Sequence, residues 1–226
     1  IGWQKQENGK SIQQTIEDSI EMLTSEKISL YGAGRTDAGV HAFGQVGHFE
    51  IKKNIELNKI RDGLNQHLRP NPIAILNVEK VDENFHSRFS AKLRSYKYRI
   101  VNRRSPLTID RNRAWAVYKK LNIKKIIYEA NNFIGKHNLA AFRSINCQSK
   151  TTTKTIESIN VNYENNELDI NISAKSFLHS QVRIMVGTLI EIGKGKIKES
   201  ISDIIKSKDR SRAGMTAPAH GLYLIK

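Results

Sequence analysis

The pattern of apolar residues in the second half of the chain places the strongest constraint on its fold. Residues 168–174 alternate between apolar and polar side chains, which is the period of a strand with one buried face. Residues 156–161 predict a second strand, and the polar run 164–167 between them predicts a hairpin turn. Near residues 177–193, apolar side chains recur at helical spacing and predict a buried helix. Strands and hairpins interspersed with helices indicate an α+β fold.

Further elements follow from the same two periodicities. A capping box that begins at Ser11 opens the first predicted helix. The predicted helices span residues 11–24, 56–68, 123–134 and 197–207, and the additional predicted strands span residues 28–31, 45–51, 73–78 and 93–101. The two halves of the chain thus repeat one plan, which fits two ferredoxin-like units with mostly antiparallel sheets flanking a central basic cleft. We expect an N-terminal domain over residues 1–86 and a C-terminal domain over residues 87–226, packed as one body.

The charge of the chain indicates a polyanionic partner. Lysine and arginine total 37 against 22 acidic residues, so the net charge is +15. Nucleic acid and an anionic membrane surface are both compatible with such an excess. No apolar run approaches the roughly 18 residues that span a membrane, and the predicted helices lack the cationic amphipathic pattern of membrane-docking helices. We therefore favour a nucleic acid and expect the basic clusters to follow the backbone of a folded RNA.

The cysteine and histidine content argues against a disulfide and against a metal site. The single cysteine, Cys147, excludes an intramolecular disulfide and is typical of a protein of the reducing cytoplasm. The seven histidines are scattered, no His-Glu-x-x-His motif occurs, and one cysteine cannot build a thiolate site. We therefore expect a cytoplasmic protein that works without a metal, in which Cys147 acts as a small apolar side chain.

The run Gly34–Ala42 concentrates candidate chemistry in one short loop. It places Arg35 and Asp37 two residues apart among glycines and follows the predicted strand at residues 28–31. Glycines on either side allow positive φ angles and a close approach of the backbone to a ligand. Loops on a rigid scaffold are where catalytic groups tend to lie. The alternative is an aspartate that only caps its own backbone in a turn.

Two well-known phosphate-binding loops do not fit this run. A dinucleotide fingerprint needs a third glycine at the position of Asp37, where a carboxylate would repel a pyrophosphate. A triphosphate-binding loop needs lysine followed by serine or threonine, where Val40 and His41 stand. The turn is therefore expected to present Asp37 rather than to hold a phosphate.

The nine residues Gly34–Ala42, followed by Gly44 and Gln45, resemble the active-site motif of the tRNA pseudouridine synthase A family. Other segments similar to that family occur in the same order along nearly the whole chain. They are residues 2–6, 85–91, 94–98, 141–143, 177–187 and 212–222. The resemblance implies an isomerase that converts uridine to pseudouridine at positions 38, 39 and 40 in the anticodon stem-loop of tRNA. It also implies a homodimer that works without a cofactor and binds one RNA across both subunits.

The resemblance assigns roles to particular residues of this chain. It implies that Asp37 is the essential carboxylate; attack on the sugar, attack on the base and removal of a sugar proton all stay open. Tyr96 matches the family tyrosine that packs on the target base, which needs a stacking partner once it is flipped out of the RNA. Arg35 is expected to contact the RNA, and His41 and Arg88 to brace the loop or touch the RNA. Tyr98 lies on the same face of its strand, and only the family match ranks Tyr96 above it as the stacking residue; the alternative for Tyr98 is packing in the core.

Arg183 is the candidate charge partner of Asp37. It lies in the apolar predicted helix, where a mostly buried guanidinium normally needs an acidic partner. His179 falls one helical turn earlier on the same predicted face and is expected to line the cleft as an RNA-binding residue. The alternatives are that Arg183 packs its stem and extends its head into solvent, and that His179 is a structural hydrogen-bond donor.

Departures from the family pattern affect the choice of target more than the chemistry. Met215 stands where the family commonly has proline, and Asn138–Ala141 replaces a more acidic and hydroxyl-rich segment. The family also has an initial strand ahead of Gly2, so we expect the N-terminus to be cut or disordered and the C-terminus to be a few residues short. The competing function is a catalytically silent RNA-binding protein on the same fold, which would leave the Arg35–Asp37 loop and a buried Arg183 unused.

Overall fold

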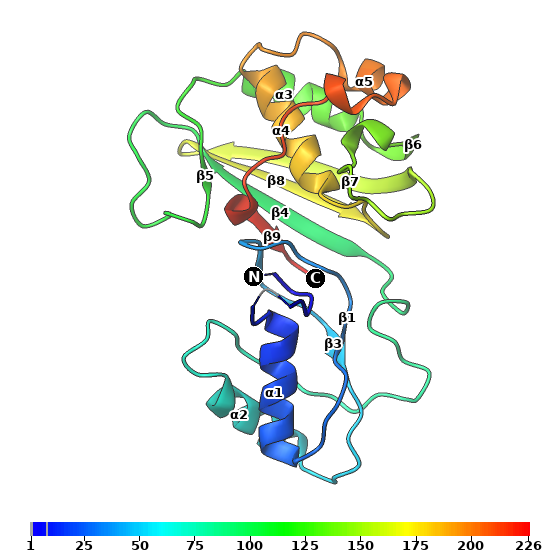
Figure 1. Cartoon of the computed structure of the whole chain (residues 1–226). Helices are drawn as coiled ribbons and strands as arrows, with labels where there is room; N and C mark the ends of the chain where they lie inside the picture. The colour runs from blue at the N-terminus through cyan, green and yellow to red at the C-terminus, as the bar shows by residue number, and fades with distance from the viewer. Residues whose placement is uncertain (1, 8) are drawn as a thin grey trace. The chain divides into compact units, whose positions relative to one another are not determined.

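The computed structural model describes residues 2–7 and 9–226 and divides the chain into two compact units (Figure 1). One unit comprises the residues up to Ala38 together with Gln45–Ala91, and the other comprises Gly39–Gly44 and Lys92–Lys226. The chain therefore passes from the first unit to the second after Ala38, inside the run Gly34–Ala42 that contains Asp37, and returns after Gly44. The mixture of helices with a mostly antiparallel sheet agrees with the predicted α+β class.

Both helices predicted for the first unit are confirmed. They are α1 (Ile12–Thr24) and α2 (Leu57–Leu68). Ser11 caps α1 as predicted, because its hydroxyl accepts a hydrogen bond from Gln14 N at 3.2 Å. The apolar faces of the two helices form the core of this unit, whose buried residues are Trp3, Ile16, Ile20, Leu30, Ile60, Leu64 and Leu68.

The strands of the first unit are shorter than predicted. From the expected strands at residues 28–31 and 45–51, only β1 (Tyr31–Gly32) and β3 (Gly47–His48) form, and they pair antiparallel. Residues 73–78 form no strand, so that prediction is wrong.

Side chains of the helices replace the missing strand hydrogen bonds. Glu17 of α1 accepts from Leu30 N at 2.9 Å, and Gln13 Nε2 donates to Leu30 O at 2.9 Å. Asn65 of α2 likewise donates to Ile75 O at 2.9 Å and accepts from Ile75 N at 2.8 Å. Backbone groups that a side chain satisfies need no neighbouring strand. Apolar alternation in these segments therefore reflects packing against the helices rather than a sheet.

The second unit is built on a mostly antiparallel sheet with the strand order β2–β9–β4–β8–β7–β6, and β5 lies beside β4. The strands are β2 (His41–Ala42), β4 (Arg94–Val101), β5 (Trp115–Ala116), β6 (Gly135–Asn138), β7 (Thr153–Glu164), β8 (Glu167–Ala174) and β9 (Leu222–Leu224). Only β2 with β9 and β4 with β5 pair in parallel among the described strands. The segment that follows Asp37 thus forms a strand at one edge of this sheet.

The hairpin between β7 and β8 forms where the sequence predicts it. Asn165 and Asn166 have φ angles of 50° and 65°, the left-handed values that a tight two-residue turn requires and that asparagine tolerates. The alternation of β8 is also confirmed, because Leu168, Ile170 and Ile172 are fully buried on one face.

Helices α3 (Ile123–Asn131), α4 (Gln181–Gly193) and α5 (Ile201–Ser207) lie on one side of this sheet (Figure 1). Every residue of α4 except Arg183 is buried, so this helix lies at the centre of the core. Short 3₁₀ turns occur at Ala140–Phe142, Arg210–Arg212 and Ala219–Gly221. Within the described residues, no helix has the length and apolar character needed to cross a membrane.

The three helices of the second unit are shorter than the apolar pattern predicts. α4 begins at Gln181 rather than near residue 177, because Ser180 has a left-handed φ of 56° that an α-helix does not accommodate. α5 begins at Ile201 rather than at residue 197, after its N-cap Ser200. α3 ends at Asn131, short of residue 134, and β6 follows almost directly.

Candidate active site

The backbone of the loop that carries Asp37 is anchored on both sides within the first unit. Trp3 N donates to Thr36 O at 3.1 Å, immediately before Asp37. Gln45 Nε2 donates to Gly34 O at 2.6 Å. The entry to the loop is therefore held by a segment from the start of the chain and by a residue from beyond the loop.

The glycines around the loop have individual steric causes. Gly39 has a φ of 80°, which L side chains rarely adopt. Gly32 packs on the indole of Trp3, where a Cβ would lie 2.5 Å from the ring. Gly2 packs on the loop itself, where a Cβ would lie 2.5 Å from Thr36 O. Close approach and one positive φ, rather than general flexibility, account for glycine at these positions.

The two charged side chains of the loop differ in exposure. Asp37 is half-buried, whereas Arg35 is exposed. A half-buried carboxylate is partly shielded from solvent, and an exposed guanidinium can meet the phosphates of an approaching nucleic acid.

Arg88 lies at the exposed end of an aromatic cluster in the first unit. Its guanidinium carbon is 5.8 Å from the ring centroid of Phe89. The ring centroids of Phe89 and His86 are 4.4 Å apart, and those of His86 and His48 are 4.6 Å apart. Burial lowers the pKa of His48, and the charge of the neighbouring His86 lowers it further.

Tyr96 and Tyr98 lie on one face of β4 but differ in environment. Tyr96 is half-buried and packs edge-to-face against Phe177, with 5.3 Å between ring centroids. Tyr98 is fully buried and donates its hydroxyl to Pro218 O at 2.7 Å. Burial raises the pKa of Tyr98 far above its usual range, and the charge of Arg183 opposes this rise. Tyr98 is therefore a core residue, and Tyr96 is the more accessible of the two.

The buried hydroxyl of Tyr98 predicts a specific dependence of stability on alkaline pH. In the unfolded chain this tyrosine ionises near pH 10, whereas in the folded chain it stays protonated to higher pH. Its contribution to stability is therefore complete below pH 10 and is lost as the pH rises above it. We expect the free energy of unfolding of the parent, relative to Tyr98→Phe, to fall by about 1 kcal/mol between pH 10 and pH 11. Urea unfolding at both pH values measures this difference, and parallel pH curves for the two proteins would contradict it.

The orientation of Arg183 is set by a segment far along the chain. Arg183 Nε donates to Ala217 O at 2.8 Å, and Ala217 N donates to Arg183 O at 3.1 Å. This pair of hydrogen bonds joins both the side chain and the backbone of Arg183 to the segment that precedes β9. The guanidinium is thus held by the protein at Nε.

His179 is not on the helix, and the prediction that it shares a helical face with Arg183 is wrong. It lies exposed in the turn before α4, because the left-handed Ser180 separates it from the helix. Its backbone is fixed to a neighbouring loop, since Ser144 N donates to His179 O at 3.1 Å and His179 N donates to Cys147 Sγ at 3.5 Å.

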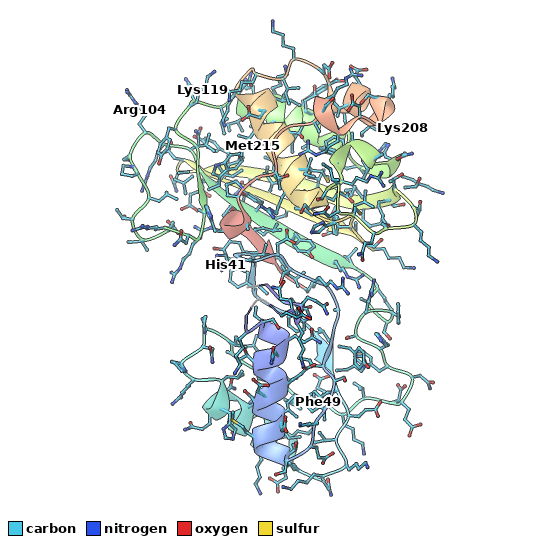
Figure 2. The ribbon with its side chains drawn as sticks, viewed as in Figure 1. His41, Phe49, Arg104, Lys119, Lys208 and Met215 are labelled. Atoms are coloured by element: carbon cyan, nitrogen blue, oxygen red, sulfur yellow. The ribbon has the colours of Figure 1, made fainter. Side chains whose placement is uncertain are left out.

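His41, labelled in Figure 2, lies on β2 and is held on two sides. Its ring stacks on Tyr223 of β9 with 4.8 Å between centroids, and its Nε2 donates to Asn112 O at 2.8 Å. Phe43 stacks on the same tyrosine at 5.2 Å. The sequence did not indicate Tyr223, because this ring stack exists only through the parallel pairing of β2 with β9.

The predicted site residues fall in both units. Arg35, Asp37 and Arg88 belong to the first unit, and His41, Tyr96, His179 and Arg183 belong to the second. Within the first unit Arg35 and Asp37 share one loop, and within the second Arg183 acts electrostatically on Tyr98, the strand neighbour of Tyr96. The pairing of Asp37 with Arg183 stays a prediction.

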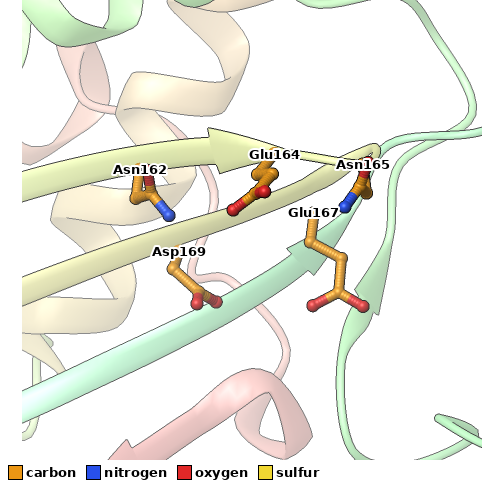
Figure 3. A pocket seen from close by; sticks show the side chains of 5 residues that line it. All are labelled: Asn162, Glu164, Asn165, Glu167 and Asp169. Carbon is orange, nitrogen blue, oxygen red and sulfur yellow. The ribbon is translucent and has the colours of Figure 1, made fainter.

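An acidic pocket lies elsewhere in the second unit, on the β7–β8 hairpin (Figure 3). Its volume is about 310 Å³, and its lining residues are Asn162, Glu164, Asn165, Glu167 and Asp169. Asp169 forms an ion pair with Lys97 at 2.6 Å. No predicted site residue lines this pocket, and its carboxylates would repel a phosphate backbone. Across residues 2–7 and 9–226, no cluster of His, Cys, Asp and Glu is arranged to hold a metal ion.

Comparisons with known proteins give the family of the chain. A family model described as tRNA pseudouridine synthase matches residues 2–90 and 130–226. Proteins named tRNA pseudouridine synthase A from Ehrlichia chaffeensis and Anaplasma phagocytophilum are 51% and 50% identical to it, and that from Wolbachia pipientis wMel is 48% identical. Each alignment covers 100% of this chain and 93% of the relative. The chain therefore belongs to the tRNA pseudouridine synthase family, whose members are isomerases.

Proposed function

We propose that this chain converts uridine to pseudouridine at positions 38, 39 and 40 of the tRNA anticodon stem-loop, with Asp37 as the essential carboxylate. The observation that carries the proposal is the intact Gly34–Ala42 motif, with its half-buried Asp37, in a member of this family. A silent RNA-binding protein on the same fold would have no need of this carboxylate. The retained motif therefore favours an active enzyme.

The reaction itself explains why we propose that no cofactor is used. The bond between N1 of uracil and C1′ of ribose breaks, the base turns, and a bond forms between C5 and C1′. The proton on C5 leaves to solvent, and N1 gains a proton. Substrate and product are isomers, so no electron or group has to be supplied. What the protein must supply is a reactive carboxylate, a surface for the displaced base and exclusion of water.

Arg183 and Tyr96 supply the other two functions in this proposal. An ionised Asp37 in a site that excludes water needs a cation beside it, and the guanidinium of Arg183 is the cation that α4 presents. Tyr96 has a ring that is half-buried and braced edge-to-face by Phe177. Such a ring replaces part of the stacking that a uracil loses when it leaves the RNA helix, worth about 1 to 3 kcal/mol per base.

The remaining predicted residues contact the RNA in this proposal. Arg35, His41, Arg88 and His179 lie on loops or at an edge strand, and Arg35, Arg88 and His179 are exposed. We further propose that the chain forms two ferredoxin-like domains, residues 1–86 and 87–226, which flank a basic cleft for the anticodon arm. The active form would be a cytoplasmic homodimer with one tRNA across both subunits.

Release of tritium from tRNA labelled at C5 of uridine tests the reaction. We expect release that depends on the chain alone, without added metal or cofactor, and that disappears when uridines 38, 39 and 40 are replaced by cytidine. Release from tRNA lacking those uridines would overturn the target positions but not the reaction. Tight binding of tRNA without any release would instead indicate a silent RNA-binding protein.

A further inference from the structure

One segment, residues 213–221, runs along α4 and down to β9 (Figure 1), and we call it the strap. Gly214 N donates to Thr188 Oγ1 at 2.9 Å. The backbone carbonyl of Met215, a residue labelled in Figure 2, packs directly on Gly187, where a Cβ would overlap it. The strap then makes its two hydrogen bonds from Ala217 to Arg183. It thus follows α4 for about one and a half turns, from Thr188 to Arg183.

The far end of the strap contacts the strand that carries Tyr96. Pro218 O accepts the hydroxyl of Tyr98 at 2.7 Å, and Gly221 packs on the Tyr98 ring, where a Cβ would lie 2.7 Å away. The strap therefore connects the helix of Arg183 to β4. A shift of the strap would move the acceptor that orients the guanidinium of Arg183.

Arg210 ties down the start of the strap. Its Nη1 donates to Gly214 O at 2.9 Å and to Ala213 O at 3.3 Å, and its Nη2 lies 3.5 Å from Thr216 Oγ1. Its partners are neutral oxygens, and burial lowers its pKa without an opposing carboxylate in the described part of the chain.

Arg212, on the same 3₁₀ turn, provides a contrast. It forms a two-pronged ion pair with Glu199, from Nη2 to Oε1 at 2.8 Å and from Nε to Oε2 at 3.0 Å. Placing a half-buried cation on backbone carbonyls is less favourable than such an ion pair. The planar guanidinium of Arg210 carries several N–H donors, and these bind several oxygen atoms of the strap at once. We take this to be the reason for an arginine at this position.

We infer that Arg210 is a positioning residue for the isomerisation: it fixes the strap, and the strap orients the guanidinium of Arg183. The inference rests on the proposed role of Arg183 as the charge partner of Asp37. Misplacing a charged group by about 1 Å can cost about a hundredfold in rate, so loss of this fork should reduce turnover without removing any group that touches the RNA.

The test compares Arg210→Met with Arg212→Met in the tritium-release assay. We expect Arg210→Met to lower kcat by about 10- to 100-fold and to change KM for tRNA by less than about threefold. Arg212→Met removes the same charge from the same turn, and its kcat should stay within about twofold of the parent. A rise in KM with unchanged kcat for Arg210→Met would make Arg210 an RNA contact and overturn the inference.

A double-mutant cycle separates positioning from a general loss of structure. If Arg210 acts through Arg183, adding Arg210→Met to Arg183→Met should lower kcat by less than about threefold more. Multiplicative losses would overturn the inference. Thr188→Val loosens the strap at its other contact without removing a charge, so it should lower kcat in the same direction even if Arg210→Met folds poorly. If Arg183→Met is as active as the parent, the proposed role of Arg183 is wrong. If Arg183→Met is impaired but Arg210→Met and Thr188→Val are as active as the parent, the role of Arg183 stands and only the inference about Arg210 is wrong.

Discussion

Replacing Asp37 by asparagine should abolish tritium release while leaving tRNA binding intact. The substitution keeps the size and the hydrogen-bonding shape of the side chain but removes its negative charge. A carboxylate that takes part in bond making has no substitute in the amide, so we expect kcat to fall by at least about 1,000-fold. The backbone around this position is held through Thr36 and Gly34, which the substitution does not touch. Single-turnover tritium release and filter binding of tRNA measure the two properties separately.

Asp62→Asn is the matched control for this experiment. Asp62 lies exposed on α2 in the same unit, where it pairs with Arg61 at 2.8 Å. Its loss changes the net charge equally and should leave kcat within about twofold of the parent. Equal release from Asp37→Asn and the parent would mean that another carboxylate carries the chemistry. Loss of tRNA binding in Asp37→Asn would mean that the residue organises the loop rather than the reaction.

Among the glycine-to-alanine substitutions in the described part of the chain, we expect Gly187→Ala to cause the largest loss of stability. A Cβ at this position would overlap the carbonyl oxygen of Met215, which is a backbone atom held from both sides by Gly214 and Ala217. The strap therefore cannot move aside without breaking its other hydrogen bonds. We expect a loss of about 3 kcal/mol, which corresponds to a fall in Tm of about 6 to 12 °C for a chain of this size. Thermal unfolding followed by circular dichroism measures it.

Gly63→Ala tests whether the cost comes from the strap or from alanine in a helix. Gly63 is also inside a helix, but its added Cβ would meet the end of the flexible Leu23 side chain at 2.7 Å. That side chain can turn away, and alanine favours the helix over glycine by about 1 kcal/mol. We expect Gly63→Ala to be close to neutral. A Gly187→Ala protein as stable as the parent would show that the strap yields easily, and would weaken its role in orienting Arg183.

Much of the local structure follows from the sequence because its causes are local. The cap at Ser11, the left-handed turn at Asn165 and Asn166, and the alternation of β8 each depend on residues a few positions apart. Predictions from local patterns were wrong where side chains from distant parts of the sequence formed the hydrogen bonds of the backbone N–H and C=O groups. Ile75 takes both of its hydrogen bonds from Asn65, so the apolar spacing at residues 73–78 did not become a strand.

The sequence by itself determined the family, the short glycine-rich loop that contains Asp37 and the apolar helix that contains Arg183. Spacing along the chain is enough for these, because each is a short motif whose side chains act through their own neighbours. Only the tertiary structure decided that β2 joins β9 and that Ala217 orients Arg183. It also removed His179 from the helix, through the left-handed Ser180. Contacts between residues far apart in the chain are chosen by packing and by the need to satisfy buried polar groups, and neither has a period in the sequence.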